Sequence, residues 1–291
     1  SASVSAAGQT CEVVVDAVLS QDGTAHIRES WKVDFESGTE WYIDRSNLGD
    51  MVLSGLSVQD ETGRTYILEE GWDIYRSLEE KDGRCGILPK PGGCEICLGP
   101  GSYGTHTFIV EYDMTNAVRA MDDYDVLHIR FVNAGLRPLP SYAKVTLWLA
   151  SGSIDDGNAA VWGFGYNGST SFEYGAAVAE TMEPFYSDDN SVILLLRFNK
   201  GIFSPAVTDE GPFSDVLEKA FYGSTYQEYL DKEAEERRTF IGFAIFLGVF
   251  IAVAALVKRR QTIRRNRKLF GVDHIKEIGW SRDLPFGGNL Y

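Results

Sequence analysis

Residues 23–35 read GTAHIRESWKVDF, and this stretch decides the fold of the chain. Apolar and polar side chains alternate along it, and the apolar face of an extended chain would carry Ile27, Trp31, Val33 and Phe35. A period of two is typical of a half-buried β-strand, because successive side chains of a strand point to opposite faces of the sheet. The stretch therefore predicts a strand with one face against a hydrophobic core and the other in water.

Similar segments recur throughout residues 11–205, separated by turn signals such as Gln21-Asp22-Gly23, and no helical pattern lies between them. We therefore predict a mainly β fold, an antiparallel β-sandwich over residues 11–210, built as one elaborated domain or as two packed subdomains. The further strand candidates are residues 11–19, 51–59, 105–114, 125–132, 142–150 and 191–198.

Helical patterning begins only after Pro212. Residues 214–238 carry a broken apolar stripe, and Ser214 suits a helix N-cap, so we predict a helical stalk over residues 211–238. Residues 239–257, TFIGFAIFLGVFIAVAALV, then run for 19 positions without a charge. A helix of this length spans roughly 28 Å, close to the hydrocarbon thickness of a bilayer, and predicts one transmembrane helix.

A dense basic cluster follows this apolar run, within residues 258–291. Such a cluster favours the cytoplasmic side, so we predict the N-terminal domain outside and residues 258–291 as a cytoplasmic tail of a single-pass cell-membrane protein. Residues 1–10, which open with the small residues SASVSAAG, are expected to be a disordered N-terminus or the remnant of a signal peptide. The residues expected to contact anionic headgroups of the inner leaflet are Lys258, Arg259, Arg260, Arg264, Arg265, Arg267 and Lys268.

Residues 1–238 carry 18 basic and 39 acidic side chains. This balance repels nucleic acid and argues against it as a partner. The acidic surface serves solubility on one interpretation and a cationic partner on another.

Four cysteines lie before the apolar run, and an even count in an exported domain favours disulfides. Residues 84–99, RCGILPKPGGCEICLG, predict a hairpin with its turn at Pro89–Gly93. Pairing Leu88 with Cys94 places Cys85 opposite Cys97, which leaves Cys94 on the other face for Cys11. A four-thiolate zinc site and free or catalytic thiols are the alternatives.

No nucleophile elbow, phosphate loop or dinucleotide fingerprint is present, and the four histidines show no metal-ligand spacing, so no cofactor is expected. The aromatic cluster Trp162, Phe164 and Tyr166 has two interpretations. It predicts either a binding face or, more simply, the packing of a strand and hairpin in the core.

Several short blocks resemble a family of predicted bacterial membrane proteins that carry the domain of unknown function 2207. The first block runs from Val13 and Val15 through Asp22-Gly23-Thr24 to Ile27 and Glu29. The resemblance implies a secretion signal, a β-rich extracytoplasmic domain, a membrane helix and a cytoplasmic part, and it brings no catalytic residue. The later blocks are Tyr112, residues 125–127, 145–150 and 196–203, and, past the apolar run, residues 275–278 and 282–285.

These observations predict a membrane-anchored binding or assembly module of the bacterial cell envelope rather than an enzyme. Its expected partners are the lipid bilayer and another membrane or envelope protein. The alternative is an extracytoplasmic metal- or thiol-dependent hydrolase, which would need titratable groups gathered in one cleft.

Overall fold

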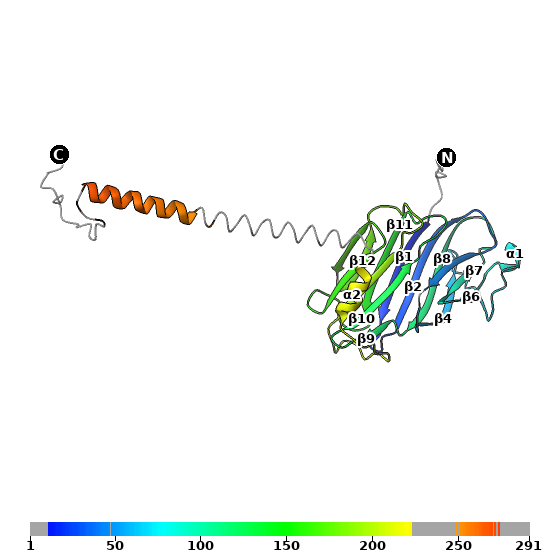
Figure 1. Cartoon of the computed structure of the whole chain (residues 1–291). Coiled ribbons are helices and arrows are strands. Elements are labelled where there is room, and N and C mark those ends of the chain that lie inside the picture. The colour runs from blue at the N-terminus through cyan, green and yellow to red at the C-terminus, as the bar shows by residue number, and fades with distance from the viewer. Residues whose placement is uncertain are drawn as a thin grey trace. The chain divides into compact units, whose positions relative to one another are not determined.

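The computed structural model describes residues 11–46, 48–222, 248, 251–269, 271 and 273 (Figure 1). The chain divides into two units, Ser1–Ala220 and Phe221–Tyr291. The first unit is mainly β, as predicted. Its described residues form fifteen strands and two helices, the short α1 (Leu78–Lys81) and α2 (Phe213–Phe221).

The largest sheet has seven strands, and β1 (Cys11–Leu19) and β2 (Ala25–Phe35) lie near its centre. Burial alternates along both strands, so the period of two seen in the sequence corresponds to a core face and an outer face. The order of this sheet, called the large sheet below, is β13 (Gly168–Glu173), β14 (Ala176–Thr181), β11 (Tyr142–Leu149), β1, β2, β8 (Gly104–Thr115) and β4 (Val52–Gln59).

Two four-stranded sheets complete the first unit. The cysteine sheet has the order β3 (Trp41–Ser46), β7 (Gly93–Leu98), β6 (Arg84–Lys90) and β5 (Ile67–Glu69). The helix-covered sheet has the order β12 (Ala159–Phe164), β15 (Val192–Phe198), β10 (Asp125–Val132) and β9 (Val118–Ala120).

Two of the three sheets are mixed, which corrects the prediction of a wholly antiparallel fold, whereas every pairing in the helix-covered sheet is antiparallel. β1 pairs with β11 in parallel, and β5 pairs with β6 in parallel across the crossover that contains α1. Alternation along one segment specifies which face is buried, but it does not specify the direction of the neighbouring strand.

Buried side chains of all three sheets form one hydrophobic cluster, with Trp31 and Phe108 from the large sheet, Ile43 from the cysteine sheet and Leu194 from the helix-covered sheet. Burying a side chain of this kind stabilises the fold by roughly 1.5–3 kcal/mol. The three sheets are therefore held by one shared core.

A charged network lies inside this core. Glu29 is on the buried face of β2, where it interrupts the apolar row predicted from the sequence, and its exposed fraction is 0%. Its carboxylate accepts hydrogen bonds from Trp31 Nε1 and from the Tyr112 hydroxyl, and it forms an ion pair with Arg45 of β3. Arg45 also donates from Nε to the Tyr112 hydroxyl. The network joins the large sheet to the cysteine sheet, and a buried ion pair needs these extra hydrogen bonds because burial removes its water.

Helix α2 packs on the outer face of the helix-covered sheet. Phe213 is buried there, with its ring centroid 5.4 Å from that of Trp162 and 6.0 Å from that of Tyr124. The Phe213 amide donates to Asp123 Oδ1, so an aspartate of the loop between β9 and β10 satisfies the helix start. The described part of the predicted stalk is therefore an element of the domain, because its apolar face has a sheet to cover. Residues 223–238 lie outside the described residues.

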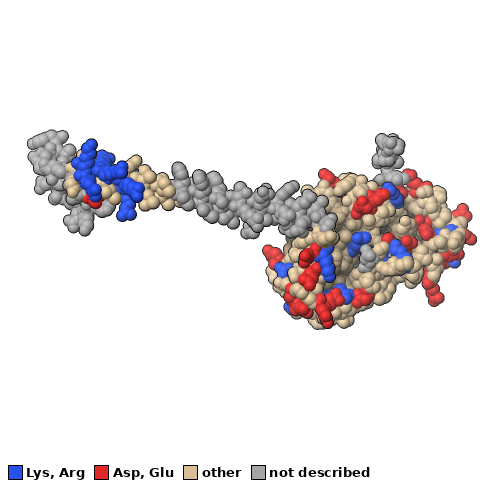
Figure 2. Space-filling model, in the orientation of Figure 1, with Lys and Arg blue, Asp and Glu red and all other residues tan. Residues whose placement is uncertain are grey.

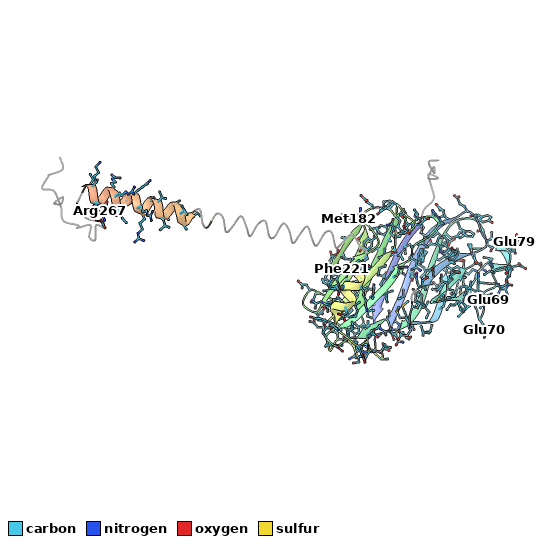
Figure 3. All side chains as sticks on the ribbon, viewed as in Figure 1. Glu69, Glu70, Glu79, Met182, Phe221 and Arg267 are labelled. Carbon is cyan, nitrogen blue, oxygen red and sulfur yellow. The ribbon has the colours of Figure 1, made fainter. Side chains whose placement is uncertain are left out.

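In the second unit, residues 251–269 are helical and carry all seven basic residues predicted to contact the inner leaflet (Figure 2). Arg267, labelled in Figure 3, binds Asp273 through two hydrogen bonds of 2.7 Å. Among the residues with described positions, no helix is long and apolar enough to cross a membrane. Most of the predicted membrane helix, and residues 1–10, lie outside them.

Candidate binding groove

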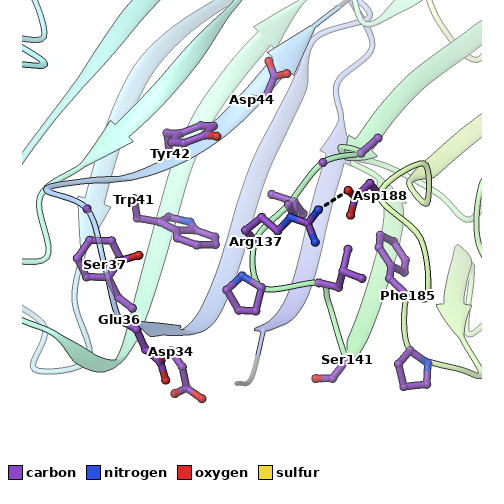
Figure 4. Close-up of a pocket in the computed structure, with 18 of the residues that line it drawn as sticks. Asp34, Glu36, Ser37, Trp41, Tyr42, Asp44, Arg137, Ser141, Phe185 and Asp188 are labelled. Carbon is purple, nitrogen blue, oxygen red and sulfur yellow. Dashed lines mark hydrogen bonds and ion pairs between the residues drawn. The ribbon is translucent and has the colours of Figure 1, made fainter. Parts of the chain in front are cut away.

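A groove of about 1260 Å³ opens on the first unit where three chain segments meet (Figure 4). Residues 34–44 form one wall, from the end of β2 to β3, and the loops at 134–141 and 184–188 form the others. The loops hold each other through two backbone hydrogen bonds, from the Phe185 amide to the Pro140 carbonyl and from the Gly135 amide to the Asp188 carbonyl. Leu136 and Phe185 are buried and anchor the two loops to the core.

The groove is acidic. Asp44 and Glu95 share Lys90, Glu40 pairs with the buried Lys81 at 2.7 Å, and Asp188 pairs with Arg137 across the mouth. The lining of the groove itself carries six carboxylates and a single guanidinium, that of Arg137. The six are Asp34, Glu36, Glu40, Asp44, Glu95 and Asp188.

Aromatic side chains line the same groove. Tyr42 and Tyr186 are 49% and 76% exposed, so their faces are available to a ligand. Trp41 is buried against Trp31, with centroids 6.1 Å apart, and in Figure 4 its ring extends toward the Arg137 loop. The Trp41 Nε1 atom is buried, and no described residue accepts its hydrogen bond. A buried donor without an acceptor is costly, so a ligand or water in the groove would relieve that cost.

The predicted aromatic face does not form as one surface. Trp162 and Phe164 pack beneath α2, whereas Tyr166 packs against the shared core and donates from its hydroxyl to the Ser169 carbonyl. Strand β12 therefore contributes packing, and two of the exposed tyrosines, Tyr42 and Tyr186, lie in the groove.

The cysteine hairpin differs from its predicted register by one residue. Cys85 pairs with Leu98 and Cys97 with Gly86, so Cys85 and Cys97 point to opposite faces of the sheet. The turn is the pair Pro91-Gly92, in which proline presets its own φ and Gly92 adopts a φ of 76°. All four cysteines belong to the described chain, and there none is bonded. The predicted Cys85–Cys97 register is wrong, and Cys11 and Cys94 are unbonded here.

The thiols are buried, and burial raises the pKa of Cys11 and Cys97 to about 12 and that of Cys85 to about 11. Burial also raises the pKa of Cys94. A catalytic thiol needs the opposite shift, because the thiolate is the nucleophile. These sites therefore do not favour the thiol-dependent hydrolase.

These thiols should make the domain sensitive to alkali. An unfolded thiol loses its proton near pH 9, whereas the folded thiols retain theirs to about pH 11–12, so the folded state binds more protons in that range. The contribution of the thiols to the free energy of unfolding should be constant below about pH 9 and fall as the pH rises toward about 12. Urea unfolding across this range measures it, with Cys97→Ala expected to reduce the slope. Rapid reaction of all four native thiols with Ellman's reagent at neutral pH would contradict the burial on which it depends.

A hydrogen-bonded chain of Ser20, His26 and Asp113 lies on the outer face of the large sheet. Ser20 Oγ is 2.9 Å from His26 Nε2, and His26 Nδ1 is 2.6 Å from Asp113 Oδ1. This is the connectivity of a serine hydrolase triad, which the sequence did not predict because the three residues lie on different segments. The backbone amides of Ser20, Gly23 and Thr24 already donate within their own turn, so these three are not available to an oxyanion. The histidine and aspartate are also about half exposed. We therefore regard these three residues as a hydrogen-bonded network on the surface and not as a catalytic triad.

The remaining strand histidines are apart. His106 stacks on Phe108, and His128 lies on β10. No group of three or more His, Cys, Asp or Glu side chains that could hold a metal occurs among residues 11–222 where they are described.

Residues 12–170 match the family model described as the N-terminal domain of a predicted membrane protein of unknown function, DUF2207. A search of curated proteins gave no match.

Among solved structures, the matches include three enzymes with low TM-scores. Native leukotriene A4 hydrolase from Saccharomyces cerevisiae has 9% identity over 65% of this chain and 28% of its own, with a TM-score of 0.38. A putative protease from Parabacteroides distasonis has 13% identity over 66% and 40%, with a TM-score of 0.34. An M1 zinc metallopeptidase from Deinococcus radiodurans has 12% identity over 65% and 42%, with a TM-score of 0.31. This chain spans less than half the length of each.

Proposed function

Because this chain belongs to the DUF2207 family of predicted membrane proteins, we propose that it is a membrane-anchored binding module of the bacterial cell envelope whose acidic groove binds a cationic polypeptide segment. The main support for this proposal is the groove itself, where an excess of carboxylates and exposed aromatic faces occur together. The proposed partner is another membrane or envelope protein.

The size and chemistry of the groove support a polypeptide ligand. A volume of about 1260 Å³ exceeds that of most small-molecule pockets, which are roughly 300–1000 Å³. Lysine or arginine would be attracted by the carboxylates and would stack on Tyr42 and Tyr186 through cation–π contacts. A carbonyl of the bound segment could accept the hydrogen bond that Trp41 Nε1 lacks.

The second unit supports the proposed anchoring. Ile251, Val253 and Leu256 on the helix of residues 251–269 are 60%, 52% and 59% exposed, and the basic cluster follows at once. Exposed apolar side chains next to a dense basic segment suit a helix that leaves the bilayer on its cytoplasmic side. We propose that the β-sandwich domain lies outside, exported by a signal peptide, and that the basic residues contact the inner leaflet.

A peptide-binding experiment tests this proposal. With the full chain in nanodiscs, a fluorescent lysine–proline peptide should bind and its glutamate counterpart should not. The double variant Glu36→Gln, Asp188→Asn should weaken binding by roughly tenfold, the effect of about 1.4 kcal/mol of lost charge complementarity. The control Asp156→Asn, Glu173→Gln removes equal charge from an exposed turn and an exposed strand end outside the groove, and it should bind as the wild type does.

The same labelled peptide, added to intact cells that express the chain, tests the topology. Binding from outside, lost in the groove double variant, is the expected result. Binding that appears only after the cells are opened would overturn the outward orientation. Equal binding by both double variants in nanodiscs would overturn the groove as the site.

A further inference from the structure

A second, smaller cavity of about 300 Å³ lies at the edge of the helix-covered sheet, away from the acidic groove. It is bounded by β10, β12 and β15, by the end of β3, and by Ala220 near the end of α2. Its polar lining differs from the rest of the domain, because the guanidinium groups of Arg45 and Arg130 and the imidazole of His128 line it, and no described lining residue is acidic. This is unexpected in a region with 39 acidic and 18 basic residues.

The two arginines of the cavity are not equivalent. Arg45 is fully committed to the buried network through Glu29, Tyr112 and the Asp44 carbonyl. Arg130 forms no ion pair with any described residue, and its Nε atom is buried without an acceptor. Since a buried guanidinium donor without a partner is destabilising, this atom indicates a missing ligand oxygen.

The local backbone explains why Arg130 reaches the cavity. The pairing of β10 with β15 shifts register between Arg130 and Val132, which is a β-bulge that redirects neighbouring side chains. On the other side of β10, the pairing with β9 extends only from Asp125 to Leu127. The edge of β10 that follows Leu127 therefore borders the cavity instead of another strand.

We infer that this cavity binds the anionic group of a carboxylate or phosphate ligand, with Arg130 as its principal donor and His128 as a second donor. The planar guanidinium presents parallel N–H groups that match two oxygens of such an anion. His128 lies two residues from Arg130 on the same strand and lines the same cavity.

The charges around His128 agree with this assignment. Burial, and then the positive charge of Arg130, lower the pKa of His128, although much of its surface remains exposed. The adjoining cavity contributes Arg119, Asp50 and Asp209, but these three pair with one another. An anion held beside Arg130 would offset its repulsion and raise the His128 pKa.

The rest of the cavity wall is apolar, with contributions from Leu48, Met51, Phe164 and Ile193. Such walls exclude water and strengthen an ionic contact, and they suit an anion attached to an apolar body. A phospholipid headgroup and a free phosphate share the recognised chemistry, and the experiment separates them.

The chain has four histidines, so His128 can be followed by NMR in the full chain with His128→Gln for assignment. In maltoside micelles, which contain no phosphate, inorganic phosphate should shift the His128 ring signals and raise its pKa, leaving His26 unchanged. Arg130→Gln should weaken the response by roughly tenfold or more, the effect of losing a charge-assisted hydrogen bond. The control Arg28→Gln removes an equal charge from an exposed pair and should respond as the wild type does.

Phosphatidylglycerol added to the same micelles forms the second arm. A response to phosphate identifies a free anion as sufficient, and a response to phosphatidylglycerol alone identifies the headgroup as the source. If Arg130→Gln does not fold, Arg130→Lys keeps the charge but loses the two-pronged contact, and it should show an intermediate affinity. No His128 response to either probe, or a response that Arg130→Gln and Arg28→Gln share equally, overturns the inference.

Discussion

Replacing Glu29 with glutamine is expected to lower the free energy of unfolding by about 3–5 kcal/mol, because it leaves Arg45 as an uncompensated buried charge. Glu29 and Arg45 are 0% and 2% exposed, so water cannot replace the lost partner. The Tyr112 hydroxyl and Trp31 Nε1 would also face a weaker acceptor. Urea unfolding of the purified chain, followed by tryptophan fluorescence, measures the change.

Two comparisons make this result specific to the buried pair. Glu111→Gln removes the carboxylate of an ion pair whose members are each 52% exposed, and it should change stability by no more than about 1 kcal/mol. The double variant Glu29→Leu, Arg45→Met removes both charges and should recover part of the loss. A cost for Glu29→Gln as small as that for Glu111→Gln would show that the network does not bind the two sheets together.

The second large effect is expected at Phe213, which holds α2 on the helix-covered sheet. Phe213→Ala removes the ring that contacts Trp162 and Tyr124 and lies 6.0 Å from the Arg197 guanidinium. Truncation of a buried phenylalanine costs about 3–5 kcal/mol, and here the loss should be local to α2. Hydrogen exchange should quicken in residues 213–221 while the amides of β1 and β2 stay protected.

Tyr75→Ala is the matched control for this measurement. Tyr75 is 91% exposed, so the loss of its ring should leave the exchange of α2 unchanged. Uniform acceleration across the large sheet in Phe213→Ala would instead mean that α2 and the sheet unfold together, and unchanged exchange in α2 would mean that the Phe213 ring does not hold the helix.

The sequence is most informative where one face of a strand is buried. Strands β1 and β10 have the predicted bounds, because their apolar residues recur at every second position or in a continuous run. Strands β13 and β14 were not among the predicted strand candidates, since small residues such as Ala176 and Ala177 give no alternation. The predicted register of the cysteine hairpin was wrong because Pro89, a residue typical of turns, pairs with Cys94 inside the strand ladder.

The candidate sites were less predictable than the strands. The acidic groove is assembled from segments at 34–44, 134–141 and 184–188, which no local pattern connects. Glu29 was a usable signal, because a charged residue in an apolar row predicts either a buried partner or a site. Arg130 gave no signal at all, since its importance depends on a bulge and on the early end of β9.

The parallel pairing of β1 with β11 determines the order in which the strands can pair while the chain is being synthesised. Val13 of β1 pairs with Ala143 of β11, which is synthesised 130 residues later. Until then, β1 has only β2 as a neighbouring strand. At roughly 5–20 residues per second, the interval between Val13 and Ala143 is about 6–26 s, far longer than the microseconds in which β1 and β2 can form a hairpin. During that interval one side of β1 presents unpaired backbone groups to any strand that arrives first. The topology therefore requires that this edge of β1 be protected during synthesis. A translation pause before residue 142 would lengthen the time in which a wrong strand can pair with it.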